Sequence, residues 1–285
     1  MFPLTHLYTA ERVLGYENHL TALGALFPDY GAFLGIGRNV CHEMGVDMYR
    51  YAAEHDPAHL DFAYGALTHG TALPGIDLYA DEEYHGRRPG FCFQKGELIA
   101  EDMAVCCNLP ETMTVWKAHN VIEMAFDILT ERRCPNLGET VLAAVEGRGE
   151  PLCVGFLEGY LRRSPEELRR MFTEVTGYFS FDGNDIEAMA DKFIVSLKRR
   201  HDIDGCDRKG LIRAIGKAVA IVEPFYDDFM DETTAEISAA LNRLRGAQRP
   251  SAESRQRNGS ASGDPADNPP PVRRHRERRG GRARR

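Results

Sequence analysis

The sequence has no long hydrophobic run and no leader of the secretory kind. Its apolar stretches fall far short of the about 20 residues that an α-helix needs to cross a bilayer. The first residues, MFPLTHLYTAERVL, lack the basic start and continuous apolar segment of a Sec signal peptide. We therefore expect no transmembrane segment and predict a cytoplasmic location.

The paired cysteines of zinc ribbons and of secreted disulfide scaffolds are also missing. There are seven cysteines, an odd number, and none of them forms a Cys-x2-Cys pair. Without a signal peptide, this pattern favours reduced thiols. Adjacent Cys106 and Cys107 are a poor metal clamp, so we expect the cysteines to serve as small buried hydrophobic side chains.

Positive charge is scarce in the body of the chain and concentrated at its end. The chain carries a net charge of −8, yet from Gly246 onward it has 11 arginines, no lysine and 4 acids, which leaves −15 on the rest. Residues 246–285 lack apolar periodicity, so we expect a disordered tail. An arginine-rich tail could contact a polyanion by counterion release. No aromatic residues interleave with the arginines for base stacking, which favours a solvated tail.

The remaining sequence reads as helices, and the prediction is an all-α, multi-helix bundle. We expect a metal-binding helical domain over residues 1–135 and a helical extension or subdomain over residues 136–245. Helix-start signals occur at Ser164-Pro165-Glu166-Glu167 and at Asp182-Gly183-Asn184-Asp185 in the second region. The run DIDGCD from Asp202 does not fit an EF-hand, so it is interpreted as a turn with helix-capping acids.

Proline and glycine set the expected boundaries in the first region. Thr5 is a fair N-cap for the first helical segment, and Pro28 is expected to break the helical pattern of residues 1–30. Asp56-Pro57 is expected to end the next helix. Residues 70–96 are rich in glycine, proline and acids, and we expect a functional loop there.

The stretch from Trp116 to Asp127, WKAHNVIEMAFD, reads as a helix with apolar residues on more than one side. Such a helix is expected to be buried. His119, Glu123 and Asp127 recur every four residues and so form one polar row along it. Buried charge needs a partner. Two interpretations remain possible: the row binds a metal ion, or His119 and Glu123 form a hydrogen bond inside a helical core.

Histidine is concentrated in the first part of the chain, where eight of the ten histidines precede residue 120. Their spacing with acids suggests one constellation of nitrogen and oxygen donors suited to zinc. The candidate ligands are His6, Asp29, His42, His69, Asp77, His85, His119 and Glu123. Together they could hold two or three metal ions of the kind that clamp a phosphate ester.

Several of these segments resemble the zinc-dependent phospholipase C family. The similar parts are THLYTAERVL, the FPD that ends at Asp29, a histidine thirteen residues later, FAYGALTHG and AHNVIE, all between residues 3 and 130. That family belongs with fungal single-strand nucleases in an all-α, three-metal superfamily. The resemblance implies a bundle of that type and zinc ligands at His6, Asp29, His42, His69, His119 and Glu123.

The chain departs from the family pattern at two points. The family's His-x3-Asp pair would require an aspartate at Leu73, and Asp77 or Asp81 could substitute for it. The best-known secreted members also use a processed N-terminal amine as a ligand, whereas His6 here follows five residues. The membrane-binding β-domain of the secreted lipases has no counterpart in this sequence.

The resemblance implies hydrolysis of a phosphate ester, a phosphodiesterase-type reaction whose substrate in the family is a phospholipid. Zinc lowers the pKa of bound water and so supplies hydroxide near neutral pH. Asp29 would bind metal and orient the nucleophile, which makes it the predicted catalytic residue. Arg38 or Lys117 could neutralise charge that develops on the phosphoryl oxygens.

Three other interpretations remain open at the level of sequence. An HD-type metal phosphohydrolase would use the His55-Asp56 doublet, with His42 or His6 before it and Asp77 after it. A carboxylate-bridged di-iron bundle would use the Glu-x2-His spacing that ends at His85. A non-catalytic helical interaction protein would retain only a degenerate metal site.

Overall fold

The computed structural model describes residues 3–178 and 185–247, and within these ranges the fold is all-α, as predicted. This part of the chain contains no β-strand, and its isolated β-bridge joins Tyr84 and Arg87. Within the same ranges, no helix combines the length and the apolar character needed to cross a membrane. The predicted disordered tail with its polyanion contact lies almost wholly in residues 248–285, outside the described residues.

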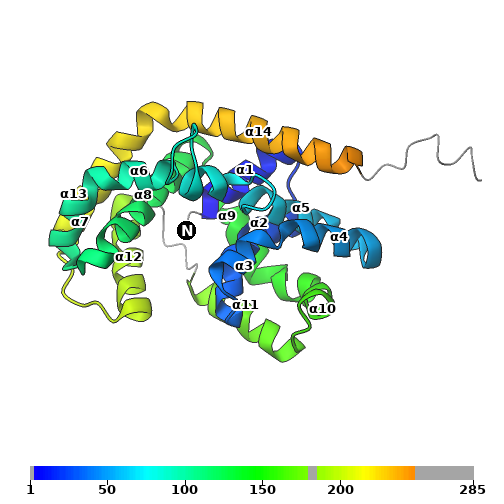
Figure 1. Cartoon of the computed structure of the whole chain (residues 1–285). Coiled ribbons are helices and arrows are strands. Elements are labelled where there is room, and N and C mark those ends of the chain that lie inside the picture. Colours follow the sequence, from blue (N-terminus) through cyan, green and yellow to red (C-terminus); the bar gives the residue numbers. More distant parts are fainter. Residues whose placement is uncertain (1–2, 179–184, 248–285) are drawn as a thin grey trace, which may run out of the picture. The chain divides into compact units, whose positions relative to one another are not determined.

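The first third of the chain folds into short helices that reverse direction at turns (Figure 1). They are α1 (Pro3–Leu14), α2 (His19–Tyr30), the 3-10 turn η1 (Gly31–Leu34), α3 (Arg38–Glu43), α4 (Gly45–His55), the 3-10 turn η2 (Pro57–His59) and α5 (Leu60–His69).

The middle third leads from a π-helical turn to the long helix that contains the polar row. Its elements are η3 (Leu78–Glu82), α6 (Phe91–Gly96), η4 (Glu97–Ile99), α7 (Ala100–Cys107) and α8 (Glu111–Arg133). Helix α8 is buried along most of its length, as its apolar sequence predicts.

The last described part consists of six α-helices, one π-helical segment and one 3-10 turn. These are α9 (Leu137–Leu142), η5 (Ala143–Arg148), α10 (Gly149–Leu161), α11 (Pro165–Tyr178), α12 (Ile186–His201), α13 (Arg208–Val222), η6 (Glu223–Phe225) and α14 (Tyr226–Ala247).

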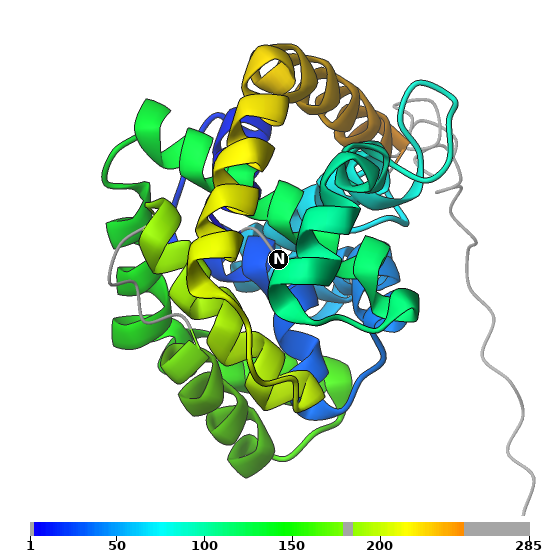
Figure 2. The same cartoon turned by 90° about the vertical axis from the view of Figure 1, so that its left-hand side faces the viewer.

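Two hydrophobic cores hold these helices together. One core gathers side chains of α6, α7, α8, α12, α13 and the first half of α14. The other gathers side chains of α1, α2, α4, α5, α10 and α11. Helix α14 contributes Phe229 to the first core and Leu241 to the second, and Figures 1 and 2 show it continuing from α13 over the other helices.

The predicted boundary near residue 135 does not separate two cores. Helices α12 and α13 pack with α7 and α8, whereas α10 and α11 complete the core of the N-terminal helices. Residues up to Leu244 accordingly form one compact unit. The region 136–245 therefore stabilises the helices that precede it instead of forming a subdomain of its own.

Most predicted helix ends in the second region are confirmed by their hydrogen bonds. Ser164 and Glu167 form the predicted capping box, in which the Glu167 backbone N–H donates to Ser164 Oγ at 3.2 Å. Asp185 accepts from the Ala188 N–H at 2.8 Å and caps α12. Asp207 caps α13 by accepting from the Lys209 N–H, so DIDGCD is a turn with a capping acid.

Three local predictions for the first region are wrong. Thr5 lies inside α1 instead of capping it, because a carboxylate from α8 caps this helix. Pro28 lies within α2, which continues to Tyr30, since the flanking helical contacts outweigh one lost hydrogen bond. The predicted loop over 70–96 contains η3 and α6, whose apolar side chains, such as Phe91, are buried in a core.

Candidate metal centre

Eight potential metal ligands from six segments lie together between these helices. They are His6 on α1, Asp29 on α2, His42 on α3, His69 on α5, Asp77 and Asp81 at the π-helical turn, and His119 and Glu123 on α8. Seven of the eight side chains are at most 5 % exposed. Asp29, at 19 %, is the one that reaches solvent.

The first group of potential ligands consists of His42, His69 and Asp77. The Nε2 atom of His42 lies 2.9 Å from Asp77 Oδ2, and the Nε2 atom of His69 lies 3.4 Å from the same oxygen. The two Nε2 atoms are 3.2 Å apart. These three donor atoms lie close enough together to hold one metal ion.

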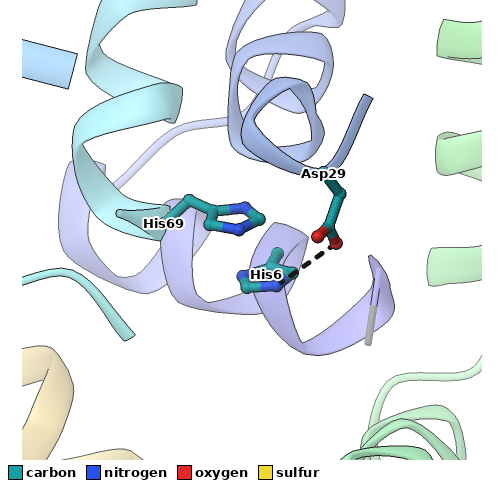
Figure 3. A group of neighbouring side chains, drawn as sticks. All are labelled: His6, Asp29 and His69. Atoms are coloured by element: carbon teal, nitrogen blue, oxygen red, sulfur yellow. Dashed lines mark ion pairs between the residues drawn. The ribbon is translucent and has the colours of Figure 1, made fainter. Parts of the chain in front are cut away.

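The second group shares His69 with the first and adds His6 and Asp29 (Figure 3). The His6 and His69 rings stack with centroids 3.6 Å apart and planes within 8°. His6 Nε2 lies 4.0 Å from Asp29 Oδ2 and 3.6 Å from Asp77 Oδ1. Because His69 belongs to both groups and Asp77 also contacts His6, the five residues form one continuous cluster.

A third group, Asp81, His119 and Glu123, lies at the helix that contains the polar row. His119 Nε2 is 3.9 Å from Asp81 Oδ1 and 3.6 Å from Glu123 Oε1. The Phe93 ring stacks on the His119 ring at 3.9 Å, and Asn120 Nδ2 donates to Glu123 Oε2 at 3.0 Å. Packing and hydrogen bonding thus fix the two α8 side chains toward Asp81.

Arg38 joins the third group to the other two. Its Nη2 lies 3.5 Å from Asp77 Oδ2 and also contacts Asp81 Oδ2. Asp77 immediately precedes the π-helical turn and Asp81 lies within it, and both carboxylates face Arg38. The Arg38 side chain is 48 % exposed, so this cation lies where the cluster meets solvent.

Backbone carbonyl groups set the tautomer of three histidines. The Nδ1–H groups of His42, His69 and His119 donate to the carbonyl oxygens of Arg38, Ala25 and Trp116, respectively. These bonds turn the Nε2 atom of each ring toward the carboxylates. Metal-binding histidines in proteins are oriented by the same kind of second bond.

Burial and neighbouring charges oppose ionisation of several side chains in the cluster. Burial lowers the pKa of His119 to about 4, and burial with the neighbouring His69 lowers the pKa of His6 well below its usual value. Burial and the charges of Asp77 and Glu123 raise the pKa of Asp81 well above its usual value. A divalent cation would remove these repulsions and bind the neutral imidazoles.

Two buried carboxylate oxygens support the same conclusion. Asp77 Oδ1 and Asp81 Oδ1 accept no hydrogen bond within the described part of the chain. Each of these oxygens instead lies within 4 Å of a histidine Nε2, from His6 and His119 respectively. Buried oxygens without donors are costly unless a cation binds them. The nitrogen and oxygen donors present therefore fit a divalent metal ion, and zinc accepts this kind of mixed ligation.

Asp127, the last member of the polar row, has a structural role. Its Oδ1 accepts from the Thr5 N–H at 3.0 Å and from Thr5 Oγ1 at 2.9 Å, and its Oδ2 lies 3.4 Å from the Leu4 nitrogen. These bonds cap the start of α1 and so fix His6 one residue later. The members of the polar row therefore have different partners. Asp127 binds the start of α1, whereas His119 and Glu123 belong to the candidate metal site.

Replacing Asp127 with alanine is expected to destabilise the protein by about 2–4 kcal/mol, because it leaves the buried donors of α1 without an acceptor. Urea denaturation followed by circular dichroism measures this change. Asp47→Ala is the control, since that side chain is 74 % exposed and should change stability by less than about 0.5 kcal/mol. Equal stabilities of the two variants would contradict the role assigned to Asp127.

Asp127 also predicts a pH dependence of stability. Burial raises the pKa of Asp127 from 3.8 to about 7, although hydrogen bonds from Thr5 oppose the shift. Between these two values the folded protein retains a proton that the unfolded chain has lost, so stability falls as pH rises through this range. Asp127→Asn should remove this contribution. An unchanged slope of unfolding free energy against pH in the variant would contradict the assignment.

Two predicted candidates lie outside the cluster. His85 is 65 % exposed and its Nε2 lies 2.7 Å from Glu232 Oε2 on α14. It has a positive φ of 52° in a turn, which directs it away from the buried donors. His55 of the HD-type doublet is 53 % exposed beside Glu54, and Asp56 pairs with His59. The doublet does not join the other histidines, which removes the geometric basis of the HD-type alternative.

Asp81 was predicted only as a substitute for the aspartate that is missing at position 73, where the chain has leucine. In the structure both Asp77 and Asp81 join the cluster. The signal that could have identified them is their spacing of four residues. A spacing of four residues places two side chains on one face only in a helix, and residues 70–96 were predicted to be a loop.

Lys117 lies near the cluster in sequence but turns toward an aromatic side chain. Its Nζ lies 3.8 Å from the centre of the Trp116 ring. Burial, with the nearby charge of Arg200, lowers the pKa of Lys117 to about 8. Arg38, which contacts both Asp77 and Asp81, is therefore better placed than Lys117 to face a bound anion.

No family model matches this sequence, and searches of curated proteins and of solved structures give no match either. The interpretation of the site therefore rests on the geometry and chemistry of the residues themselves.

Proposed function

We propose that this protein is a zinc-dependent hydrolase of phosphate esters. The observation that carries the proposal is the joining of three ligand groups: His69 is common to two of them, and Arg38 contacts Asp77 and Asp81, which link them to the third. Clusters of two or three zinc ions are suited to phosphate esters, since they bind both the attacking and the leaving oxygen.

The bound zinc would supply hydroxide near neutral pH by lowering the pKa of a water molecule. The chain's own part is to hold and orient the reacting groups. Asp29 Oδ1 lies 3.8 Å from His42 Nε2, and its Oδ2 lies 4.0 Å from His6 Nε2, so this carboxylate faces both histidine groups. Asp29 is the candidate ligand most exposed to solvent. Its carboxylate is therefore placed to accept a hydrogen bond from the attacking water and to fix the direction of that water.

Arg38 is suited to bind the substrate's phosphoryl oxygens. Guanidinium groups donate two parallel hydrogen bonds to phosphate, and the half-exposed side chain of Arg38 can reach solvent-borne substrate. Zinc bound to Asp77 and Asp81 would compete with Arg38 for their carboxylate oxygens. The guanidinium group would then be free to bind the phosphate ester. The phosphate ester remains the proposed substrate class, with phospholipid as one member to be tested.

The test is hydrolysis of bis(p-nitrophenyl) phosphate, p-nitrophenyl phosphate and phosphatidylcholine by the purified full chain. We expect hydrolysis of at least one ester that a chelator abolishes and zinc restores. The His119→Ala/Glu123→Ala double variant should lose at least about 100-fold in kcat/KM, since even outer-shell changes cost 10–100-fold.

A second double variant serves as the matched control. His55→Ala/Asp56→Ala removes the exposed doublet of the HD-type alternative and should leave activity unchanged. Loss of activity in this control, with activity retained in the α8 variant, would favour the HD-type reaction. Zinc binding without hydrolysis of any ester would instead indicate a non-catalytic metal site.

A further inference from the structure

Three thiols gather about α13 at a distance from the histidine cluster along the sequence. Cys106 and Cys107 end α7, and Cys206 lies in the turn between α12 and α13. The Asp207 backbone N–H donates to the Cys106 carbonyl oxygen at 2.6 Å. This bond holds the turn against the end of α7 and brings the three sulfur atoms together.

The sulfur atoms of Cys107 and Cys206 are unusually close, at 2.6 Å. The Cys106 and Cys107 sulfur atoms, by comparison, are 3.6 Å apart. The Cys107–Cys206 distance is closer to the length of an S–S bond, about 2.05 Å, than to the Cys106–Cys107 distance. The positions of Cys107 and Cys206 are therefore compatible with a covalent bond after a small movement.

Packing of the neighbouring helix makes the approach of the two segments a property of the fold. A Cβ at Gly210 on α13 would lie 2.7 Å from Cys106 Cβ, so only glycine allows α13 to approach α7 so closely. The burial of Leu211 and Ala214 in the core of α7 and α8 holds this contact. The two thiols therefore need no large rearrangement to meet.

We propose that Cys107 and Cys206 form a reversible disulfide bond, a modification site independent of the metal cluster. Cys107 is fully buried and Cys206 is half-buried, so a small disulfide in solution reaches Cys206 first. The Cys206 thiolate attacks that disulfide, which yields a mixed disulfide and one thiolate. The Cys107 thiolate then attacks Cys206 Sγ and displaces the second thiolate. Both released thiolates take up the protons of the two cysteines.

The bond would connect positions separated by 99 residues, including all of α8. A cross-link over so long a loop restricts the unfolded chain strongly. We expect oxidation to raise the melting temperature by about 5–10 °C. Because α8 contains His119 and Glu123, the same bond would limit the motion of the helix that provides two of the candidate ligands.

The test is to incubate the reduced full chain with glutathione disulfide and count thiols after denaturation. Five of the seven cysteines should remain titratable, and peptide mapping without reductant should yield one linked pair. Fragmentation between Cys106 and Cys107 then identifies the bonded sulfur. Seven titratable thiols, a stable glutathione adduct on Cys206, or a bond through Cys106 would each overturn the proposal.

Matched variants separate the disulfide from general effects of cysteine loss. Cys206→Ser should abolish both the linked peptide and the rise in melting temperature. Cys106→Ser and Cys134→Ser should retain both, because neither cysteine takes part in the proposed bond. They are matched controls, since Cys106 is adjacent to Cys107 and Cys134 is half-buried like Cys206. Loss of the linked peptide in Cys106→Ser would also contradict the assignment.

Discussion

Asp77→Asn is expected to lower zinc binding and phosphate-ester hydrolysis more than any other single substitution. Asp77 Oδ2 lies within 3.5 Å of His42, His69 and Arg38, and its Oδ1 lies 3.6 Å from His6. One carboxylate thus serves two ligand groups and the bridging arginine. The variant keeps the shape of the side chain but removes its negative charge.

We expect the variant to lose at least one zinc ion per chain and about 100-fold or more in kcat/KM. Zinc content by plasma mass spectrometry and the hydrolysis assay measure the two losses. His85→Ala is the control, because the structure places this predicted ligand on the surface beside Glu232. A full zinc content in Asp77→Asn, or a loss of zinc in His85→Ala, would contradict the assigned ligand set.

Gly65→Ala is expected to have the largest effect on stability. Helices α2 and α5 cross in close contact, and a Cβ at position 65 would lie 2.2 Å from the Thr21 carbonyl oxygen and 2.6 Å from the Ala25 nitrogen. Gly24 faces α5 in the same way, with its Cβ position 1.9 Å from the Phe62 carbonyl oxygen. Backbone atoms cannot yield without moving the helix.

We expect Gly65→Ala to reduce the free energy of unfolding by about 3 kcal/mol or more. The site should suffer as well, since α2 provides Asp29 and the Ala25 carbonyl that orients His69. Gly155→Ala on α10 is the control: that glycine is exposed with no atom near its Cβ position, so alanine should stabilise by about 0.5–1 kcal/mol. Equal urea midpoints for the two variants would argue against the helix contact.

The all-α fold could be predicted because helical periodicity and capping residues act locally. Ser164, Asp185 and Asp207 cap the helices at which they were placed. The way in which the later helices complete the two cores could not be predicted, since it depends on long-range packing, and the boundary expected at residue 135 is not found. Helices α10 to α13 have apolar faces of their own, and the sequence does not say that these faces cover α2, α5 and α8.

Residue type was enough to predict most of the candidate ligands. It was not enough where the direction of the side chain determines whether a residue joins the cluster. His6, His42, His69 and His119 were expected and lie in the cluster. His85 was expected for its residue type alone, but a turn at the surface directs it to Glu232. Residue type does not encode side-chain direction.

Asp127 illustrates the same limit within one helix. Its four-residue spacing from Glu123 predicted a shared role, and both side chains are buried on α8. The difference between them comes from what packs opposite: the start of α1 for Asp127, and His119 with Asp81 for Glu123. Only the three-dimensional arrangement separates a helix cap from a candidate ligand.

The most direct test of the central claim is anomalous diffraction at the zinc edge from crystals of the zinc-loaded protein. We expect one anomalous peak among His42, His69 and Asp77 and another among Asp81, His119 and Glu123. Peaks confined to surface sites such as His85 with Glu232, or no peak within the cluster, would contradict the claim.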